Sequence, residues 1–143
     1  MLNGERSGKG KAEKKDAGIS YNGDWLNDKQ HGEGMMIHPD GKSYKGSWWK
    51  GKPQGRGTET YQKDISYTGD FKDGKKHGFG KLENADGRYY FGDWVEDKQH
   101  GKGTEKYKDG SSYTGDFVRK KRHGSGKYTE ADGTFYEGQW VDN

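Results

Sequence analysis

The sequence predicts an all-β fold, an elongated antiparallel meander of stacked β-hairpins. A tyrosine recurs every 23 residues, which identifies the chain as a repeat array. Each tyrosine begins six residues in which an aromatic residue or glycine alternates with a polar residue, the period of a β-strand. A turn signal and a Gly-x-Gly sequence follow, as expected for a hairpin. The six tyrosines are Tyr21, Tyr44, Tyr67, Tyr90, Tyr113 and Tyr136.

Each unit reads Y-x-G-x-[WF]-x5-H-G-x-G-x5-D-G-x-x, and its elements follow in that order. The first strand covers repeat positions 1 to 6. A turn comes next, as at Asn27-Asp28-Lys29, with Arg119-Lys120-Lys121 as its weakest example. A second short strand is expected to begin at the Gly-x-Gly, and an Asp-Gly pair such as Asp40-Gly41 ends it.

The expected pairing within a hairpin sets repeat position 5 against 14, and position 3 against 16. In the first full repeat, Trp25 would then lie over Gly34 and Met36 over Gly23. Glycine leaves room for a large side chain to lie flat across the backbone. A register error of one residue would exchange the two faces of the strand.

The period brings the whole chain into one continuous array. The first 20 residues look unstructured, yet the spacing Gly4 to Gly10 matches Gly74 to Gly80, with Ser7 at the histidine position and one extra residue near Ala17. Both ends resemble incomplete hairpins, which favours a longer array or end-to-end self-association. The expected units are a partial repeat at 1–20, full repeats at 21–43, 44–66, 67–89, 90–112 and 113–135, and a partial repeat at 136–143.

Composition narrows the class of protein. Hydrophobic residues make up only 25% of the chain, a value typical of disorder, but aromatic residues reach 14% and occupy fixed repeat positions, so packing between neighbouring repeats is expected. The absence of cysteine excludes a disulfide framework, and no apolar run is long enough for a membrane span. A cytoplasmic protein is the expectation. The net charge of +3 does not favour nucleic acid as a partner.

The repeat pattern argues against catalysis, cofactors and metals. All 26 glycines fall on the repeat frame, which leaves none for a separate phosphate-binding loop. Four of the five histidines share one repeat position, and hairpin repeats advance by roughly 9 to 10 Å, too far for one ion to be shared. We expect these histidines to pack on, or hydrogen-bond to, the turns, with Gln54 in the same role. The chain is therefore expected not to be an enzyme and to hold no cofactor.

Two features are left after the scaffold is accounted for. A row of basic residues near the turns could attract anionic lipid headgroups, although edge lysines also serve simply to prevent aggregation. It consists of Lys29, Lys52, Lys75, Lys76, Lys98, Lys121 and Arg122. The other feature is a groove of aromatic anchors interrupted by acids, suited to a peptide or helix of a partner protein, although the same rings could merely hold the sheet together. The predicted groove residues are Tyr21, Trp25, Tyr44, Trp48, Tyr61, Tyr67, Phe71, Tyr90, Trp94, Tyr107, Tyr113, Phe117, Glu59 and Glu105.

One segment of the chain runs from Tyr90 through Trp94, His100, Gly101 and Gly103 to the Asp-Gly pair that follows. This segment resembles the MORN (membrane occupation and recognition nexus) repeat. The resemblance covers about residues 3 to 143. It implies an extended, twisted, single-layer β-sheet that serves as a binding and scaffolding module, with phospholipid binding on the lysine row and peptide binding in the aromatic groove.

Three functions follow from the sequence and this resemblance. The leading hypothesis is a non-catalytic scaffold that grips a partner protein segment along the aromatic groove, in a cytoskeletal or axonemal (ciliary) assembly. The second is a peripheral membrane adaptor that binds anionic phospholipid through the lysine row. The third, an accessory module of a larger enzyme, would depend on sequence outside this chain.

Overall fold

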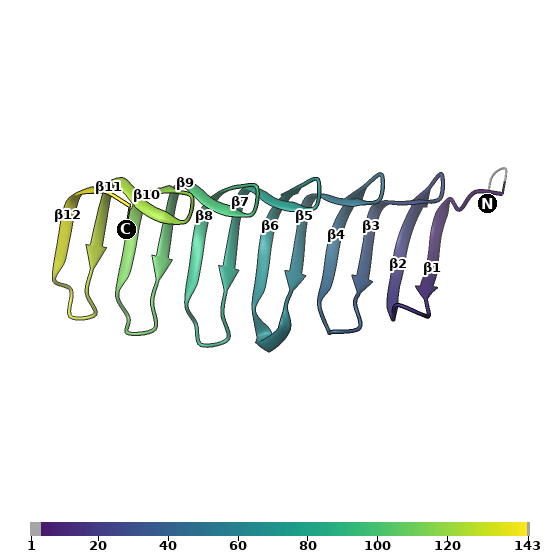
Figure 1. Ribbon diagram of the computed structural model, residues 1–143, viewed down its shortest axis with the longest axis horizontal. Helices are drawn as coiled ribbons and strands as arrows, with labels where there is room; N and C mark the ends of the chain where they lie inside the picture. The colour runs from purple at the N-terminus through teal and green to yellow at the C-terminus, as the bar shows by residue number, and fades with distance from the viewer. Residues whose placement is uncertain (1–3, 143) are drawn as a thin grey trace. The chain divides into compact units, whose positions relative to one another are not determined.

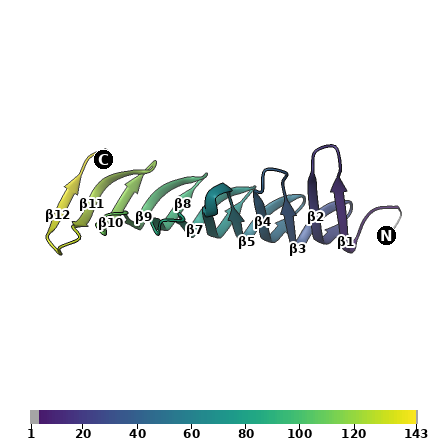
Figure 2. The same cartoon turned by 90° about the horizontal axis from the view of Figure 1, so that it is seen from below.

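The computed structural model describes residues 4–142, with Lys63 described in its backbone only, and divides into two compact units. Unit 1 is Met1–Lys75 and unit 2 is Lys76–Asn143. Within each unit the strands lie side by side in chain order, each antiparallel to its neighbours, as both views show (Figures 1 and 2). This confirms the predicted all-β meander of stacked hairpins. The outermost residues of the two predicted partial repeats, 1–3 and 143, lie outside the described residues.

Unit 1 contains six strands and one short 3-10 turn. The strands are β1 (Gly8–Lys14), β2 (Ile19–Leu26), β3 (Lys29–Ile37), β4 (Ser43–Trp49), β5 (Lys52–Thr60) and β6 (Ser66–Lys72). The 3-10 turn η1 (Gln62–Asp64) joins β5 to β6, where this repeat lacks the Asp-Gly pair, and Asp64 takes a positive φ of 57° there. β1 pairs with β2 in the register that β3 makes with β4, with Gly10 opposite Gly23 as Gly34 is opposite Gly46.

Unit 2 repeats the arrangement. Its strands are β7 (Lys75–Glu83), which begins at the boundary residue, β8 (Tyr89–Val95), β9 (Lys98–Lys106), β10 (Ser112–Val118), β11 (Lys121–Thr129) and β12 (Phe135–Trp140).

Two-residue turns join the strands within each hairpin, as predicted. Asn27 and Asp28 have φ values of 50° and 66°, and Arg119 and Lys120 have 48° and 74°. Positive φ at both central residues defines the type I′ turn, whose twist matches that of the flanking strands. Even the weakest predicted turn therefore has the same geometry as the others.

The predicted pairing within the hairpin is wrong by two residues. Tyr21 pairs with Met36 and Gly23 with Gly34, after which the pairing jumps to Trp25 with Gln30. The jump leaves residues 31–33 opposite Asp24, in a bulge where Gly32 has a φ of 82°. The bulge also explains why β3 begins at Lys29, earlier than the predicted start at the Gly-x-Gly. Because the error is an even number of residues, the predicted faces of the strands are kept.

A hydrogen bond from the main chain to an aspartate side chain stabilises three of the bulges. The Asp24 carboxylate accepts a hydrogen bond from the backbone N–H of Glu33 at 3.0 Å. Asp93 and Asp116 accept the same bond from Lys102 and Ser125, at 3.1 and 3.0 Å. The aspartates that recur in the sequence thus satisfy an N–H that the bulge removes from the strand ladder.

The core of each unit is a ladder of aromatic rings on one face of the sheet, called here the aromatic face. In unit 1, Tyr21 makes edge-to-face contacts with Trp25 and Trp48, at centroid distances of 5.0 and 5.2 Å, and Tyr44 continues the ladder. Such pairs contribute about 0.5–1.5 kcal/mol each beyond the area they bury. In unit 2, Tyr90 and Tyr113 occupy the equivalent places.

The polar atoms of the ladder are satisfied by the backbone. The Tyr21 hydroxyl donates to the carbonyl of Asp24 at 2.7 Å, and the Trp48 indole Nε1–H donates to the carbonyl of Gly34 at 3.0 Å. A Cβ at Gly34 would collide with the Tyr21 ring, so glycine is needed under this tyrosine, as it is under Tyr44, Tyr90 and Tyr113. The rings therefore lie flat over the glycine pairs, as expected, but it is tyrosine and not Trp25 that covers Gly34.

Candidate partner-binding face

The ladder rings predicted to line the groove are buried, which changes their role. All ten have between 0% and 7% of their surface exposed. They are Tyr21, Trp25, Tyr44, Trp48, Tyr67, Phe71, Tyr90, Trp94, Tyr113 and Phe117. Burial of this extent supports the alternative reading, that these rings hold the sheet together. It leaves the partner-binding role to the less buried side chains around them.

The remaining four predicted groove residues stay partly accessible. Glu59, Tyr61, Glu105 and Tyr107 are all half-buried on the aromatic face. Burial raises the pKa of the Glu105 carboxyl, and the Tyr107 hydroxyl and the Arg122 charge only partly offset this rise. The pKa of Tyr107 is also raised, chiefly by burial and then by the Glu105 charge. This acid and this phenol therefore share a partly desolvated environment.

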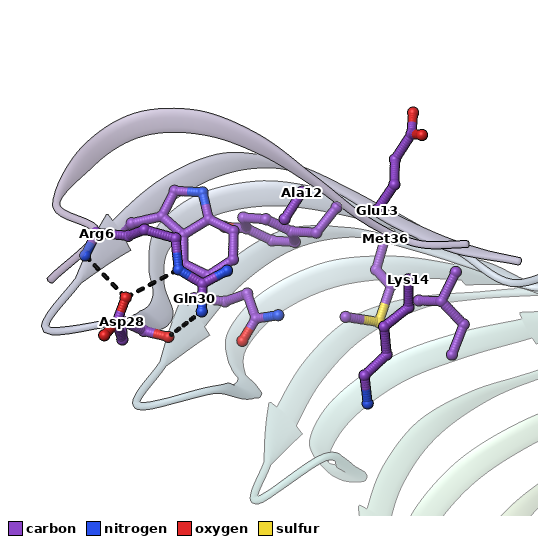
Figure 3. A pocket seen from close by; sticks show the side chains of 10 residues that line it. Arg6, Ala12, Glu13, Lys14, Asp28, Gln30 and Met36 are labelled. Carbon is purple, nitrogen blue, oxygen red and sulfur yellow. Dashed lines mark hydrogen bonds and ion pairs between the residues drawn. The ribbon is translucent and has the colours of Figure 1, made fainter. Parts of the chain in front are cut away.

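Two hollows lie along the aromatic face of unit 1. Figure 3 shows the first, where Arg6 bonds to Asp28 at one side and Met36 lies at the other. The second is lined by Met36 together with Pro53 and Glu59. Met36 thus borders both hollows. Its unbranched, polarizable side chain adapts readily to an apolar partner surface.

A third hollow lies on the aromatic face of unit 2. Its lining includes Leu82, Tyr90, Gln99, Glu105 and Tyr107. The sequence interpretation did not include Gln99 or Gln30 among the site residues. Both stand at repeat position 10, and the signal that could have found them is the pairing of this position with the Trp or Phe at position 5.

Five of the seven residues in the predicted basic row have exposed side chains. Lys29, Lys52, Lys75, Lys98 and Lys121 are all exposed. Four of these lysines each pair across the hairpin with an apolar residue whose side chain is also exposed. These pairs are Leu26 with Lys29, Trp49 with Lys52, Val95 with Lys98 and Val118 with Lys121.

Lys76 and Arg122 do not belong to this row, which corrects the prediction. They follow the row lysines by one residue, and successive side chains of a strand point to opposite faces. The Lys76 side chain is 15% exposed and lies 3.7 Å from Asp97, and the Arg122 guanidinium lies 5.1 Å from the Trp140 ring centroid. Both cations therefore lie on the aromatic face. The opposite face is called here the outer face.

The repeated histidine position supports the turns, as predicted. His31 Nδ1 accepts a hydrogen bond from the backbone N–H of Lys50 in the next turn, at 3.4 Å, and its ring centroid lies 4.5 Å from that of Trp49. In the next repeat, Gln54 Oε1 accepts from the N–H of Asp73 at 2.9 Å. The position thus requires a hydrogen-bond acceptor rather than a metal ligand. Over residues 4–142, no cluster of three or more His, Asp or Glu side chains is arranged to hold a metal ion.

The fold and this face define a β-hairpin repeat protein whose chemistry lies on a surface. MORN repeats are recognised at residues 21–43, 44–64, 67–87, 90–112, 113–135 and 136–143. The chain belongs to the MORN repeat family, whose repeats commonly serve in binding. No protein with a curated description matches it significantly. Within the described part of the chain, no helix has the length and apolar character needed to cross a membrane.

Proposed function

We propose that this chain is a non-catalytic scaffold that binds a segment of a partner protein along its aromatic face. The observation that carries the proposal is the set of three hollows on that face, where a buried ring ladder is bordered by half-buried Met36, Glu59 and Glu105. An apolar floor with a few fixed polar groups suits an amphipathic segment. The setting we propose is a cytoskeletal or axonemal assembly, by analogy with other MORN proteins.

Truncating a ladder ring would not test this proposal, because the loss of a core ring would unfold the repeat. Two adjacent methionines offer a better test. Met36 is half-buried on the aromatic face, whereas Met35 is 37% exposed on the outer face. A photo-crosslinking benzoyl-phenylalanine placed at either position would report which face contacts a partner in an extract of the cells that express the protein.

We expect the crosslinker at Met36 to label one mapped segment of a partner, and the crosslinker at Met35 not to label it. A synthetic peptide of that segment should then bind the wild-type chain. Labelling of the same segment from Met35 alone would place the partner on the outer face and contradict the proposal.

A second candidate function is binding to anionic phospholipid through the row of five lysines. The observation that favours it is the pairing of each of four lysines with an exposed apolar side chain, of which Trp49 is 53% exposed. An apolar group that enters the headgroup region beside a lysine that contacts phosphate is suited to a membrane surface.

Liposome sedimentation tests this second function. Replacement of Lys29, Lys52 and Lys98 with glutamate should abolish salt-sensitive binding to vesicles that contain a phosphoinositide. The same charge change at Lys11, Lys45 and Lys127, which are exposed away from the turns, should reduce binding far less. Equal losses in the two triple variants would mean that net charge alone governs binding.

A further inference from the structure

The side chain at repeat position 10 lies on the aromatic face, where a cation can contact aromatic rings. Where the residue at this position is basic, its charged group lies over the Trp ring of the following repeat. The Arg6 guanidinium is 4.3 Å from the Trp25 ring centroid, and the Lys76 ammonium is 5.7 Å from that of Trp94. A cation within about 6 Å of a ring centroid is attracted by the ring's negative face.

Among the basic residues at position 10, Arg122 has the most aromatic rings around its charged group. Its guanidinium lies 5.4 Å from the ring centroids of Tyr107 and Tyr113, 5.3 Å from that of Tyr128 and 5.1 Å from that of Trp140. The array thus encloses a guanidinium among four rings drawn from successive repeats of unit 2.

One repeat earlier, the same position is Gln99, and a hollow of about 310 Å³ lies beside it. Gln99 is only 7% exposed, yet its Oε1 has no hydrogen-bond partner among the described residues. The buried Tyr107 hydroxyl interacts with the Glu105 carboxylate and the Arg122 guanidinium. A buried polar atom without a partner costs about 1–3 kcal/mol, so the Gln99 oxygen favours a ligand that supplies a donor.

Glu105 adds a carboxylate to the same hollow, and no described Lys, Arg or His lies within 4.0 Å of it. Burial raises its pKa, while the Tyr107 hydroxyl and the more distant charges of Arg122 and Lys120 lower it. Desolvation disfavours an unpaired carboxylate, and a cation placed beside it would relieve that cost.

The hollow offers the Gln99 oxygen and the Glu105 carboxylate as acceptors beside the ring of Tyr107. A guanidinium carries five N–H donors and no acceptor, and it stacks on aromatic rings. We propose that the hollow beside Gln99 receives an arginine side chain of the bound partner segment, with Glu105 as its counter-ion and the Gln99 carbonyl oxygen as a hydrogen-bond acceptor. This inference rests on the proposed function and names the partner group that the face recognises.

Part of this combination recurs in unit 1. There Glu59 and Tyr61 stand at the spacings of Glu105 and Tyr107, and Glu59 lines a hollow with Pro53, which occupies position 10 and offers no side-chain acceptor. The Lys42 ammonium lies 5.4 Å from the Tyr61 ring centroid. By contrast, the repeats whose own residue is Lys76 or Arg122 carry Leu82 and Tyr128 at the glutamate position. The glutamate is thus present in two repeats without a basic residue at position 10 and absent from two that have one. The repeat of Gln30 carries Met36 instead, and the proposal does not extend to it.

The rim of the hollow in unit 2 limits which segment can bind. Arg88, which pairs with Asp86 at 2.9 Å, and the exposed Lys106 and Lys120 are part of the lining of the hollow. A run of basic residues would be repelled by these lysines. The expected partner segment therefore presents a single arginine flanked by acidic residues.

An NMR titration of the full chain tests the inference with a defined probe. The probe is an acetylated, amidated pentapeptide with arginine at its centre and glutamate at both ends, compared with the same peptide in which neutral citrulline replaces arginine. We expect the arginine peptide to shift the Gln99 side-chain amide resonances saturably. The citrulline peptide should bind at least about tenfold more weakly, because a tenfold change corresponds to about 1.4 kcal/mol, a modest value for a charge-assisted contact.

Three variants complete the experiment. Gln99→Arg should fill the hollow with its own guanidinium, as Arg122 does in the next repeat, and so abolish binding without loss of the folded spectrum. Glu105→Gln should weaken binding at least about tenfold. The matched control is Glu83→Gln, which removes an exposed carboxylate paired with Lys81 on the outer face, and it should change nothing.

Equal affinity for the two peptides, or undiminished binding by Gln99→Arg, would overturn the inference. If Gln99→Arg failed to fold, the result with Glu105→Gln would still decide. If crosslinking from Met36 succeeds while the arginine peptide does not bind, only the arginine assignment fails. If crosslinking fails as well, the proposed function itself fails.

Discussion

Gly126→Ala should unfold unit 2 at a lower denaturant concentration, because the added methyl group has no space. A Cβ at this position would collide with the Tyr113 ring, which has 0% of its surface exposed and cannot move toward solvent. Displacement of that ring would break its hydrogen bond to the Asp116 carbonyl and its two edge-to-face contacts, with Phe117 and Trp140.

The size of the effect follows from these contacts. The hydrogen bond is worth about 1 kcal/mol and each ring contact about 0.5–1.5 kcal/mol. The lower conformational entropy of alanine in the unfolded chain returns about 0.4–1 kcal/mol. The expected net loss is therefore about 2 kcal/mol, measured as the shift in urea midpoint by circular dichroism.

Gly138→Ala is the matched control, since Gly138 pairs with Gly126 and also lies beneath a tyrosine. There the added Cβ would come within 2.8 Å of the Tyr136 hydroxyl, but Tyr136 is 52% exposed and its ring can move aside. We expect a change of less than about 0.5 kcal/mol. Equal destabilisation by the two substitutions, or none by Gly126→Ala, would refute the view that buried rings require the glycine pairs.

Three further predictions concern the groups that support the hairpins. His31→Ala should destabilise unit 1 by about 1 kcal/mol and His31→Gln by much less, since Gln54 already supplies the same acceptor; urea unfolding measures both. Asp116→Ala should speed amide hydrogen exchange at Ser125, whose N–H bonds to that carboxylate, whereas an unchanged exchange rate would show that water replaces the bond. Burial raises the pKa of Tyr21 to about 12, so its contribution to stability is complete below about pH 10 and is lost as the pH rises toward 12, at about 1.4 kcal/mol per pH unit. Alkaline unfolding followed by circular dichroism checks that window, and stability that stays constant to pH 12 would contradict it.

Most of the fold could be predicted because the same strand and turn pattern recurs in every repeat. A strict alternation fixes which side chains share a face, and paired turn residues fix where the strands reverse. The bulge could not be predicted in this way, because alternation does not reveal residues that pair with nothing. Only the combination of Asp24 with Gly32 at positive φ shows it, and that combination becomes visible once the pairing is known.

The candidate site was predicted in part for the same reason. Glu59, Glu105, Tyr61 and Tyr107 were assigned to the aromatic face because an error of two residues does not change faces. The ladder rings were expected to be open to a partner because sequence shows which face a ring occupies but not how many neighbours cover it. Their burial depends on contacts with the next repeat, as between Tyr21 and Trp48, and these contacts are set by the register.

The positions that vary between repeats are where a partner can be distinguished. The ladder rings, the glycine pairs and the turn acceptors recur because each satisfies a structural requirement of the hairpin, so they cannot tell one ligand from another. Position 10 and the glutamate that follows it vary together without disturbing the ladder, since Arg122 and Gln99 occupy equivalent places. Under the proposal above, a cation supplied by the array closes a site, and a neutral residue with a nearby carboxylate opens one. Specificity in such an array would therefore depend on which repeats lack a basic residue at position 10. Gln99→Arg adds such a residue and leaves the scaffold intact.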